Sequence, residues 1–522
     1  MKNKKIILLS IIGLLIIVFF SLYNSLNFTY YERGHVGDKN NYINTILKEK
    51  VPKNIRRFVR DTIFVFKKVP ILEQSLEDEK IENKQLKTIL SYLGAELLKS
   101  EQFNIELEEI ARCVQKRGGE FGLPKKSATS CVKEEIDAYI EFEFKKNKTI
   151  NQKLHNINLS LKTFTSPILK LTGPRSYLSY YNQNLFLITG TGILMYTSLD
   201  NLKNEKFVFK RIDNNFENIV GLDHIKNKTL VKNLLIKNNK IYVSYVKKVK
   251  DKCFTSEILV SSLKFEKIIF NKFFNINECQ PEYTNGTGGN LSEFKDNKIL
   301  MAIGGYRSYS NQGNNNPQNI NSFMGKIISI SEKTKEYRIL SMGLRNPQGL
   351  YYDKKNNVIY STDHGPQGGD EINVNTSPDG EIKNYGWGIS SYGEHYKFPH
   401  RINPKLYKLA PLNKSHAKYG FIEPLKYFTP SIAPTQIIKT EKFINIPNKN
   451  IIYIGALGFS DQIEEGDMSI HQFILDADLK IEQHNIMPVG ERVRDMIYIE
   501  ELNKIFLFLE TSGSIGMLEV DN

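Results

Sequence analysis

From about Ser160 to the C-terminus, hydrophobic and polar residues alternate with a period of two, and the pattern is repeated along the chain. Each copy begins with a polar, asparagine-rich turn and continues as a short apolar strand, which small residues usually follow. The copies align on the apolar positions Leu185, Ile241, Ile299, Ile359, Ile452 and Ile505, with spacings of 56, 58, 60, 93 and 53 residues.

Short strands repeated at this period are typical of a β-propeller. Six copies predict six blades, and the long interval between Ile359 and Ile452 predicts an insertion. A single blade cannot bury both of its faces, so the ring must close, and the loops on one side then line a central funnel. A sandwich of unrelated strands is the alternative, which the six in-phase copies disfavour. We predict an all-β six-bladed β-propeller over residues 160–522.

The region before the propeller has a helical period. Apolar residues recur at helical spacing, while Glu, Lys and Gln fill the other faces, at Leu86, Ile89, Leu90, Leu93, Leu97 and Leu98. We predict an α-helical region over residues 40–150. Two interpretations remain open: a spacer that lifts the propeller off a membrane, or a binding module packed on it.

The N-terminal residues 1–23 predict a membrane anchor. Three lysines precede the apolar run Ile6–Phe20, and from Ile6 no charged residue occurs until Glu32. A transmembrane helix over about residues 6–23 is therefore long enough to cross a bilayer. The basic flank should stay in the cytoplasm. We expect a single-pass inner-membrane protein with its main domain in the periplasm. A cleaved signal peptide is the alternative, although no small-x-small site follows Phe20.

Composition changes this picture little. Hydrophobic residues make up 40% and charged residues 25% of the chain, as in ordinary globular proteins. The formal net charge of +14 comes from lysines spread along the sequence, so we expect no nucleic-acid partner. The four cysteines form two local couples, Cys113 with Cys131 and Cys253 with Cys279. In an exported domain these could be disulfides, and four buried free thiols are the alternative.

Candidate chemistry is concentrated around the insertion, in residues 343–350, 363–373 and 384–387, which are rich in Gly, Asn and aromatic residues. Gly-Pro and Gly-Gly steps expose backbone carbonyls, and the adjacent Asp370 and Glu371 offer hard oxygen ligands, a combination suited to Ca²⁺. Arg492 and Arg494 would project to the same side of an extended strand. Such a pair suits a ligand with more than one carboxylate.

Residues 343–373 and 384–396 resemble the glucose/sorbosone dehydrogenase family of quinoprotein propellers. Further matches occur in the same order at residues 319–327, 429–434, 454–457 and 492–495, so the resemblance covers roughly residues 175–520. The resemblance implies a propeller that binds pyrroloquinoline quinone (PQQ) and Ca²⁺. It also implies oxidation of the C1 hydroxyl of an aldose to a lactone, with electrons passed to a respiratory acceptor.

The resemblance also assigns site residues. Cofactor contacts would come from Arg345, Asn346, His364, Tyr396, Arg492 and Arg494. The carbonyls of Gly365 and Pro366 would hold the cofactor's Ca²⁺, and Glu371 and Tyr385 match a second, structural Ca²⁺ site.

The chain departs from the family at the catalytic base. The family has a histidine in a segment that corresponds to Asn285-Gly-Thr-Gly-Gly-Asn-Leu291, where Gly286 occupies the position of the base. Glycine cannot accept a proton. Asn290 and Gly458 replace a family arginine and lysine, and nearby candidates for a substitute base are Glu282, Tyr283, His395 and His400. Two hypotheses follow: a sugar dehydrogenase with an altered base, or a non-catalytic propeller that binds a glycan or protein at the cell envelope.

Overall fold

The computed structural model describes residues 139–152, 157–166, 169, 175–220, 230–250, 253–279, 286–305, 316–366, 368–393, 415–447, 449–458 and 468–521. All of them belong to one compact unit of the chain. The predicted anchor over residues 1–23 and the predicted helical residues 40–138 lie outside this part. Within it, no helix has the length and apolar character that a membrane crossing requires.

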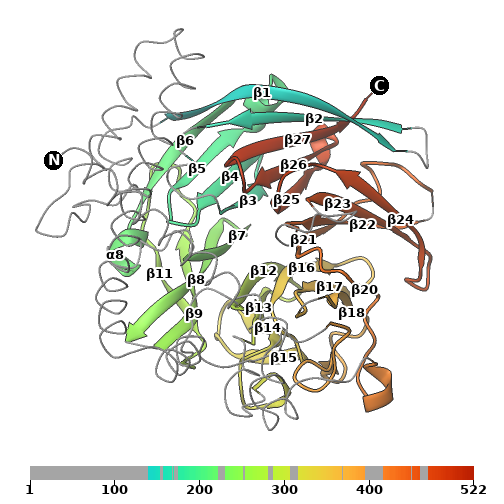
Figure 1. Ribbon diagram of the computed structural model, residues 1–522. Helices are drawn as coiled ribbons and strands as arrows, with labels where there is room; N and C mark the ends of the chain where they lie inside the picture. Colours follow the sequence, from blue (N-terminus) through green and yellow to red (C-terminus); the bar gives the residue numbers. More distant parts are fainter. Residues whose placement is uncertain are drawn as a thin grey trace, which may run out of the picture. The chain divides into compact units, whose positions relative to one another are not determined.

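The described strands form a propeller-like all-β fold of antiparallel sheets arranged about a common centre (Figure 1). In chain order, the first group of four strands consists of β3 (Ser176–Tyr181), β4 (Asn184–Thr189), β5 (Leu194–Ser198) and β6 (Phe207–Asn214). The second consists of β7 (Val231–Lys237), β8 (Lys240–Lys250), β9 (Cys253–Ser262) and β11 (Asn271–Asn275). The third consists of β12 (Gly288–Phe294), β13 (Lys298–Ile303), β14 (Lys326–Ser331) and β15 (Tyr337–Met342).

The remaining three groups also contain four strands each, and in all six groups the first-named strand lies nearest the centre. The fourth consists of β16 (Pro347–Asp353), β17 (Val358–Asp363), β18 (Asp370–Asn375) and β20 (Lys426–Phe428). The fifth consists of β21 (Pro434–Lys439), β22 (Asn450–Ala456), β23 (Ser469–Leu475) and β24 (Ile481–Pro488). The sixth combines β25 (Val493–Ile499), β26 (Lys504–Leu509) and β27 (Ser514–Val520) with β2 (Ile157–Thr165) from the N-terminal side.

The other described elements are short or peripheral. The strands β10 (Lys267–Ile268) and β19 (Lys383–Asn384) pair with β6 and β15. Two α-helices, α7 (Leu199–Lys203) and α8 (Phe216–Val220), follow strands of the first group. The 3-10 helices are η2 (Asn316–Gln318), η3 (Ala417–Tyr419) and η4 (Glu500–Leu502).

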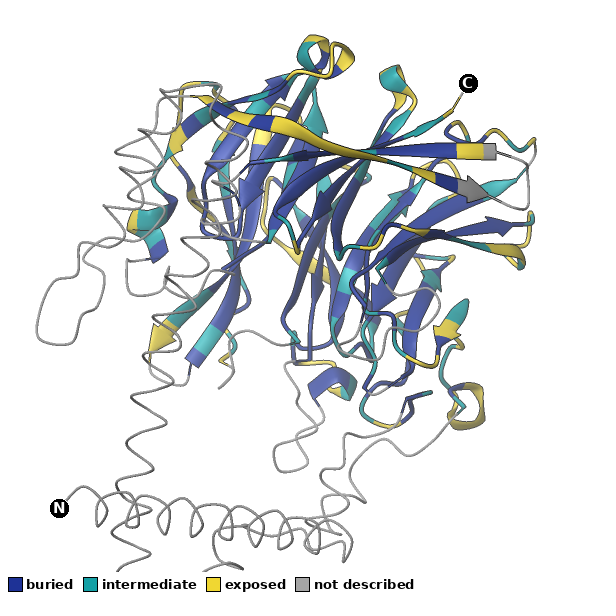
Figure 2. Cartoon of the chain, turned by 45° about the horizontal axis from the view of Figure 1, so that its top comes forward, coloured by how far each residue is buried: buried dark blue, intermediate teal, exposed yellow. Residues whose placement is uncertain are grey.

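The second strand of each group carries the repeat found in the sequence. Its aligned apolar residues are at most 1% exposed: Leu185, Ile241, Ile299, Ile359, Ile452 and Ile505. They are buried because neighbouring sheets pack face to face, with apolar clusters joining the first and second groups, the second and third, and so on to the fifth and sixth. Figure 2 shows this burial along the strands around the centre. The predicted all-β propeller fold is confirmed.

The ring is closed by strands from both ends of the described chain. The innermost strands β3, β7, β12, β16, β21 and β25 contact one another in this order, and β25 contacts β3. Strand β2 pairs with β27 from Leu159 opposite Val520 to Thr165 opposite Ser514. Strand β1 (Tyr139–Gln152) pairs with both β2 and β6, so it joins the sixth group to the first in a single sheet.

Residues 139–150, which the sequence predicted as helical, form most of β1 instead. The physical reason is a local period of two, since Ile140 and Phe142 are buried while Glu141 and Glu143 are exposed. The β-structure therefore begins before the predicted boundary at residue 160.

Cys253, at the start of β9, and Cys279, after β11, form a disulfide, as the sequence suggested. The couple Cys113 and Cys131 lies outside the described residues. The disulfide links the two outer strands of the second group across a sequence separation of 26 residues.

Replacing both Cys253 and Cys279 with alanine is expected to lower the free energy of unfolding by about 3 kcal/mol, because the cross-link restricts the unfolded chain. Urea unfolding followed by circular dichroism measures the change. Wild-type protein in dithiothreitol is the matched control, and it should approach the midpoint of the double variant. Equal midpoints for the oxidised wild type and the variant would contradict a stabilising role.

Candidate functional site

Each inner strand begins at the edge of its sheet where the second strand ends, so all six inner strands start on one side of the ring. We call this side the entry face. Hydrogen bonds connect neighbouring groups there: the Gly288 N–H donates to Asn346 Oδ1 at 3.2 Å, and the Gly305 N–H donates to the Arg345 carbonyl at 2.6 Å. The candidate site residues described below gather at this face.

Three arginines share one carboxylate at the entry face. Arg175, directly before β3, and Arg492, directly before β25, each place Nε 3.5 Å from Glu510 Oε1. Arg494 Nε donates to Glu510 Oε2 at 2.5 Å, and both of these residues are buried. Burial alone would raise the pKa of Glu510, but the three arginines hold it below its ordinary value. Positive charge is therefore in excess.

Arg492 also contacts the end of the fifth group. Its Nη1 donates to the carbonyls of Leu457 at 3.1 Å and Gly458 at 3.2 Å. Arg492 and Arg494 both reach Glu510, so they project to the same side of the chain, as the sequence predicted. Much of their hydrogen-bonding capacity is used within the protein.

Arg345 and Asn346 are held in place by a buried carboxylate. Asp363 accepts the backbone N–H of Arg345 at 2.8 Å and that of Asn346 at 2.6 Å. Burial and, to a smaller extent, the nearby Glu371 raise the pKa of Asp363 to about 7, although the N–H groups of Arg345 and Asn346 lower it. Arg345 Nη1 donates to the His364 carbonyl at 2.8 Å, and its guanidinium carbon lies 5.4 Å from the centre of the Trp387 ring.

His364 lies beside these arginines and is neutral at pH 7. Loss of hydration lowers the pKa of its imidazole to about 3, and the positive charges of Arg345, Arg494 and Arg492 act in the same direction. Its Nε2 lies 2.7 Å from the Pro434 carbonyl. Because a carbonyl only accepts, Nε2 carries the proton and Nδ1 is the acceptor.

The Gly365–Pro366 turn is fixed by Asp370. This carboxylate accepts the N–H of Gly365 at 2.8 Å and those of Ile432 and Ala433 at 2.9 and 2.7 Å. Asp370 therefore orders the turn, and its oxygens are engaged by backbone groups. The Pro366 carbonyl accepts the Ser431 hydroxyl at 3.2 Å. Carbonyl oxygens are suitable Ca²⁺ ligands, so this turn fits the first calcium site that the resemblance implies.

Glu371 has a different environment from the one expected. His416 Nε2 lies 2.9 Å from Glu371 Oε1, and Asn373 Nδ2 donates to Oε2 at 3.1 Å. His416 Nδ1 in turn lies 2.5 Å from Ser390 Oγ. A histidine side chain thus satisfies the carboxylate that, with Tyr385, was expected to bind a second calcium ion. The donor set at Glu371 does not fit that ion as it stands, and the part of the chain that the structure describes contains no cluster of three or more His, Cys, Asp or Glu residues suited to a metal.

The position of the family base is at the entry face. Gly286 lies two residues before β12 with φ of 77°, and it offers no proton acceptor. Asn290 Nδ2 donates to the Gln348 carbonyl at 2.7 Å and to Gln436 Oε1 at 3.1 Å, so residues of three inner strands meet there. Tyr396 and the substitute bases considered above, Glu282, Tyr283, His395 and His400, lie outside the described residues.

Three residues at this face were not predicted from the sequence: Arg175, Lys232 and Glu510. A usable signal existed for Lys232, because it is a lone cation at the start of a strand whose residues are almost all buried. The amine lies beside Arg175, Arg494 and Glu510, which act on its charge. The convergence of the three residues becomes visible only once the ring closes.

Lys326 orders the turn that contacts the Arg345 loop. Its ammonium donates to the carbonyls of Asn316, Pro317 and Met324 at 3.0, 3.0 and 2.7 Å. The same turn accepts the Gly343 N–H through Pro317 at 3.0 Å, two residues before Arg345. A buried lysine therefore holds together the turn on which the Arg345 loop rests.

Replacing Lys326 with methionine is expected to lower the free energy of unfolding by about 3 kcal/mol or more, because three buried carbonyls lose their donor. Urea unfolding measures the loss. Lys333→Met, an exposed position after the same strand, is the matched control and should change stability by no more than about 0.5 kcal/mol. Similar midpoints for the two variants would show that the turn does not depend on the ammonium.

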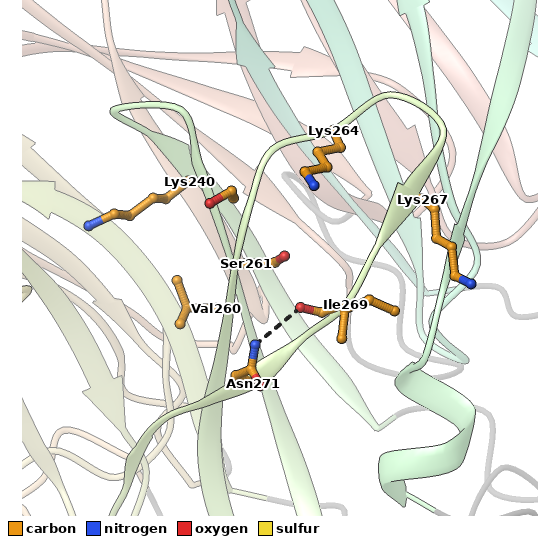
Figure 3. A pocket seen from close by; sticks show the side chains of 8 residues that line it. Lys240, Val260, Ser261, Lys264, Lys267, Ile269 and Asn271 are labelled. Atoms are coloured by element: carbon orange, nitrogen blue, oxygen red, sulfur yellow. Dashed lines mark hydrogen bonds between the residues drawn. The ribbon is translucent and has the colours of Figure 1, made fainter.

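A separate hollow of about 420 Å³ lies at the outer strands of the second group, between β9 and the β10–β11 segment (Figure 3). Its lining includes Lys240, Lys264 and Lys267, and Asn271 Nδ2 donates to the Ile269 carbonyl at 3.4 Å. Lys240 begins β8 and so lies at the end of its sheet opposite the entry face. The hollow is therefore separate from the candidate site.

Comparisons with known proteins agree with the propeller-like fold. The sequence model of a family described as Glucose / Sorbosone dehydrogenase matches residues 229–515, which is more than half of the chain. Aldose sugar dehydrogenase YliI of Escherichia coli is 28% identical over 229 residues, 41% of this chain and 54% of that protein. An uncharacterized protein of Synechocystis is 27% identical over 257 residues, 44% of this chain and 55% of that protein. The chain thus spans about half the length of these relatives.

Solved structures share the fold. A glucose dehydrogenase crystal structure is 18% identical, with a TM-score of 0.51 over 67% of this chain and 97% of the other. The apo-form of the soluble aldose sugar dehydrogenase from Escherichia coli is 19% identical, with a TM-score of 0.51 over 67% of this chain and 96% of the other. At this level of identity the likeness extends to the propeller fold.

Proposed function

The chain belongs to the glucose/sorbosone dehydrogenase family, and we propose that it binds PQQ at the entry face and acts on an aldose sugar there. The observation that carries the proposal is the excess of positive charge: Arg175, Arg492 and Arg494 share the single carboxylate of Glu510. A ligand with several carboxylates complements such a cluster. Arg345, placed by Asp363, adds a further guanidinium at the same face.

Each residue then has a defined task. Arg345, Arg492 and Arg494 bind and orient the anionic cofactor, and Asn346 supplies an amide next to them. Neutral His364 offers Nδ1 as an acceptor without adding positive charge. The carbonyls of Gly365 and Pro366 would hold the calcium ion.

Bound at this face, PQQ would supply the two-electron oxidant for conversion of an aldose to its lactone, and the proton of the C1 hydroxyl would need an acceptor on the protein. The chain has glycine at position 286, so that proton has no positioned acceptor there. A missing general base costs typically about 10²–10⁴ in rate. We therefore expect slow oxidation.

Calorimetric titration of the protein with PQQ, with and without Ca²⁺, tests the proposal. Calcium-dependent binding at micromolar affinity or tighter is the expected result, followed by detectable aldose oxidation with an artificial electron acceptor. Absence of binding in both conditions would refute the enzymatic proposal.

We further propose that the protein is exported and held at the inner membrane by residues 1–23, with a respiratory electron acceptor as its partner. The disulfide between Cys253 and Cys279 supports an oxidising compartment such as the periplasm. Membrane fractionation and alkylation of thiols in intact cells would test both points.

A second candidate function is a non-catalytic propeller that binds a glycan or protein through the entry face. Gly286 favours it, because the family's base is replaced by a residue with no side chain. The engagement of Arg492 by the Leu457 and Gly458 carbonyls also favours it. Binding of PQQ distinguishes the two candidates.

A further inference from the structure

Lys232 is the least explained charged residue at the entry face. It is the second residue of β7, and its side chain is only 9% exposed. Its amine forms no hydrogen bond or ion pair with the described residues. The amine nitrogen is not among the fully buried polar atoms that lack a partner, so it reaches solvent at the end of a largely buried side chain, where a ligand could contact it.

The packing around Lys232 holds the side chain in place. Gly289 of β12 lies against it so closely that a Cβ on this glycine would be 2.4 Å from Lys232 Cβ. Gly289 has φ of 108°, and its carbonyl accepts the Ser244 hydroxyl from β8 at 2.5 Å. The close approach of β12 thus depends on a glycine. The lysine is enclosed between neighbouring inner strands.

The charges around Lys232 are unbalanced. Arg175 beside β3 and Arg494 of β25 oppose its protonation, and Glu510 after β26 favours it. Burial and, to a smaller extent, the two arginines lower the pKa of the Lys232 amine to about 7, against the opposing effect of Glu510. Gly289 of β12, which lies against Lys232, is not titratable. Asp495, whose pKa burial raises to about 7, also acts on Arg494, so two carboxylates face three arginines and a lysine.

We propose that Lys232 and Arg175 form an anion subsite beside Arg494. This subsite binds a carboxylate of the ligand, and Lys232 takes up a proton when the anion binds. The identity of the ligand as PQQ rests on the proposed function, whereas the subsite itself requires only a polycarboxylate. An anion would supply the missing negative charge and stabilise the ammonium form. These two residues would thereby supply positive charge that is absent at Asn290 and Gly458, where the family has cations.

Proton uptake provides the test. We would titrate the full chain at pH 8 with PQQ and, separately, with citrate, in two buffers that differ in ionisation enthalpy. At this pH the amine is mostly neutral in the unliganded protein. The wild type should take up close to one proton per bound anion. Lys232→Met should abolish the uptake and weaken binding at least 10-fold.

The control variant is Lys240→Met, in the same sheet but at the end opposite the entry face. It should leave both uptake and affinity unchanged, and thermal unfolding should show that the Lys232→Met protein is folded. The Arg175→Gln variant should also weaken the binding of both probes.

The outcomes separate the inference from the proposed function. PQQ binding that neither takes up a proton nor changes in Lys232→Met would overturn the subsite and leave the proposed function standing. Citrate binding with Lys232-dependent uptake, without PQQ binding, would support the subsite and refute the quinone. If neither probe binds, both are refuted.

Discussion

Replacing Gly286 with histidine is expected to raise the rate of aldose oxidation by about 10²–10⁴, because the imidazole supplies the general base that this chain lacks. The position lies at the entry face, within the turn that leads into β12. An imidazole there would accept the proton of the C1 hydroxyl and leave the arginine contacts unchanged. The turnover number, measured with PQQ, Ca²⁺, an aldose and an artificial acceptor, reports the gain.

Gly286→Ala is the matched control, because it also places a side chain at this backbone conformation but supplies no base. Gly286 has φ of 77°, a region in which any side chain has a cost, although histidine occurs there more often than most residues. Comparing the two variants therefore isolates the imidazole. If PQQ binds to both proteins and the histidine variant is no faster than the alanine variant, the non-catalytic candidate gains the advantage.

The core of the fold could be predicted because its signal is local. In each group the second strand is apolar on both faces, as expected for a sheet packed between two neighbours. The asparagine-rich turns before these strands also have a physical reason, since a left-handed backbone occurs at Asn182, Asn239, Asn297, Asn357 and Asn503. Asparagine tolerates this conformation better than most residues. The repeat in the sequence is thus a repeat of turn and strand chemistry.

The closure of the ring could not be predicted in the same way. Strand β2 is paired with β27, although more than 300 residues separate Leu161 from its partner Leu518. An alternating pattern indicates a strand but does not name its neighbour. In β1 the alternation is confined to a few residues near Tyr139, and the charged residues that follow it resemble an exposed helix.

The candidate site was predicted only in part, for a related reason. Arg345 and Arg492 stand in recognisable motifs, whereas Arg175 and Lys232 are single cations in separate copies of the repeat. Their proximity depends on the contacts of β3 with both β7 and β25. Similarly, the histidine partner of Glu371 was not predicted, because it lies 45 residues further along the chain. Partners brought together by tertiary structure leave no local signal.

The closure strand gives the largest expected effect on stability. Leu161→Asp is expected to lower the free energy of unfolding by more than about 5 kcal/mol, because it removes a buried leucine and introduces an unpaired charge. Leu161 is 1% exposed and belongs to the cluster that joins β2 to the fifth and sixth groups. A loss of this size approaches the whole stability of many proteins, so the ring should open.

Circular dichroism and urea unfolding measure the effect. Leu161→Met is the volume-conserving control, and it should cost less than about 1.5 kcal/mol. An unchanged midpoint for Leu161→Asp would mean that the ring holds without the β2–β27 pairing.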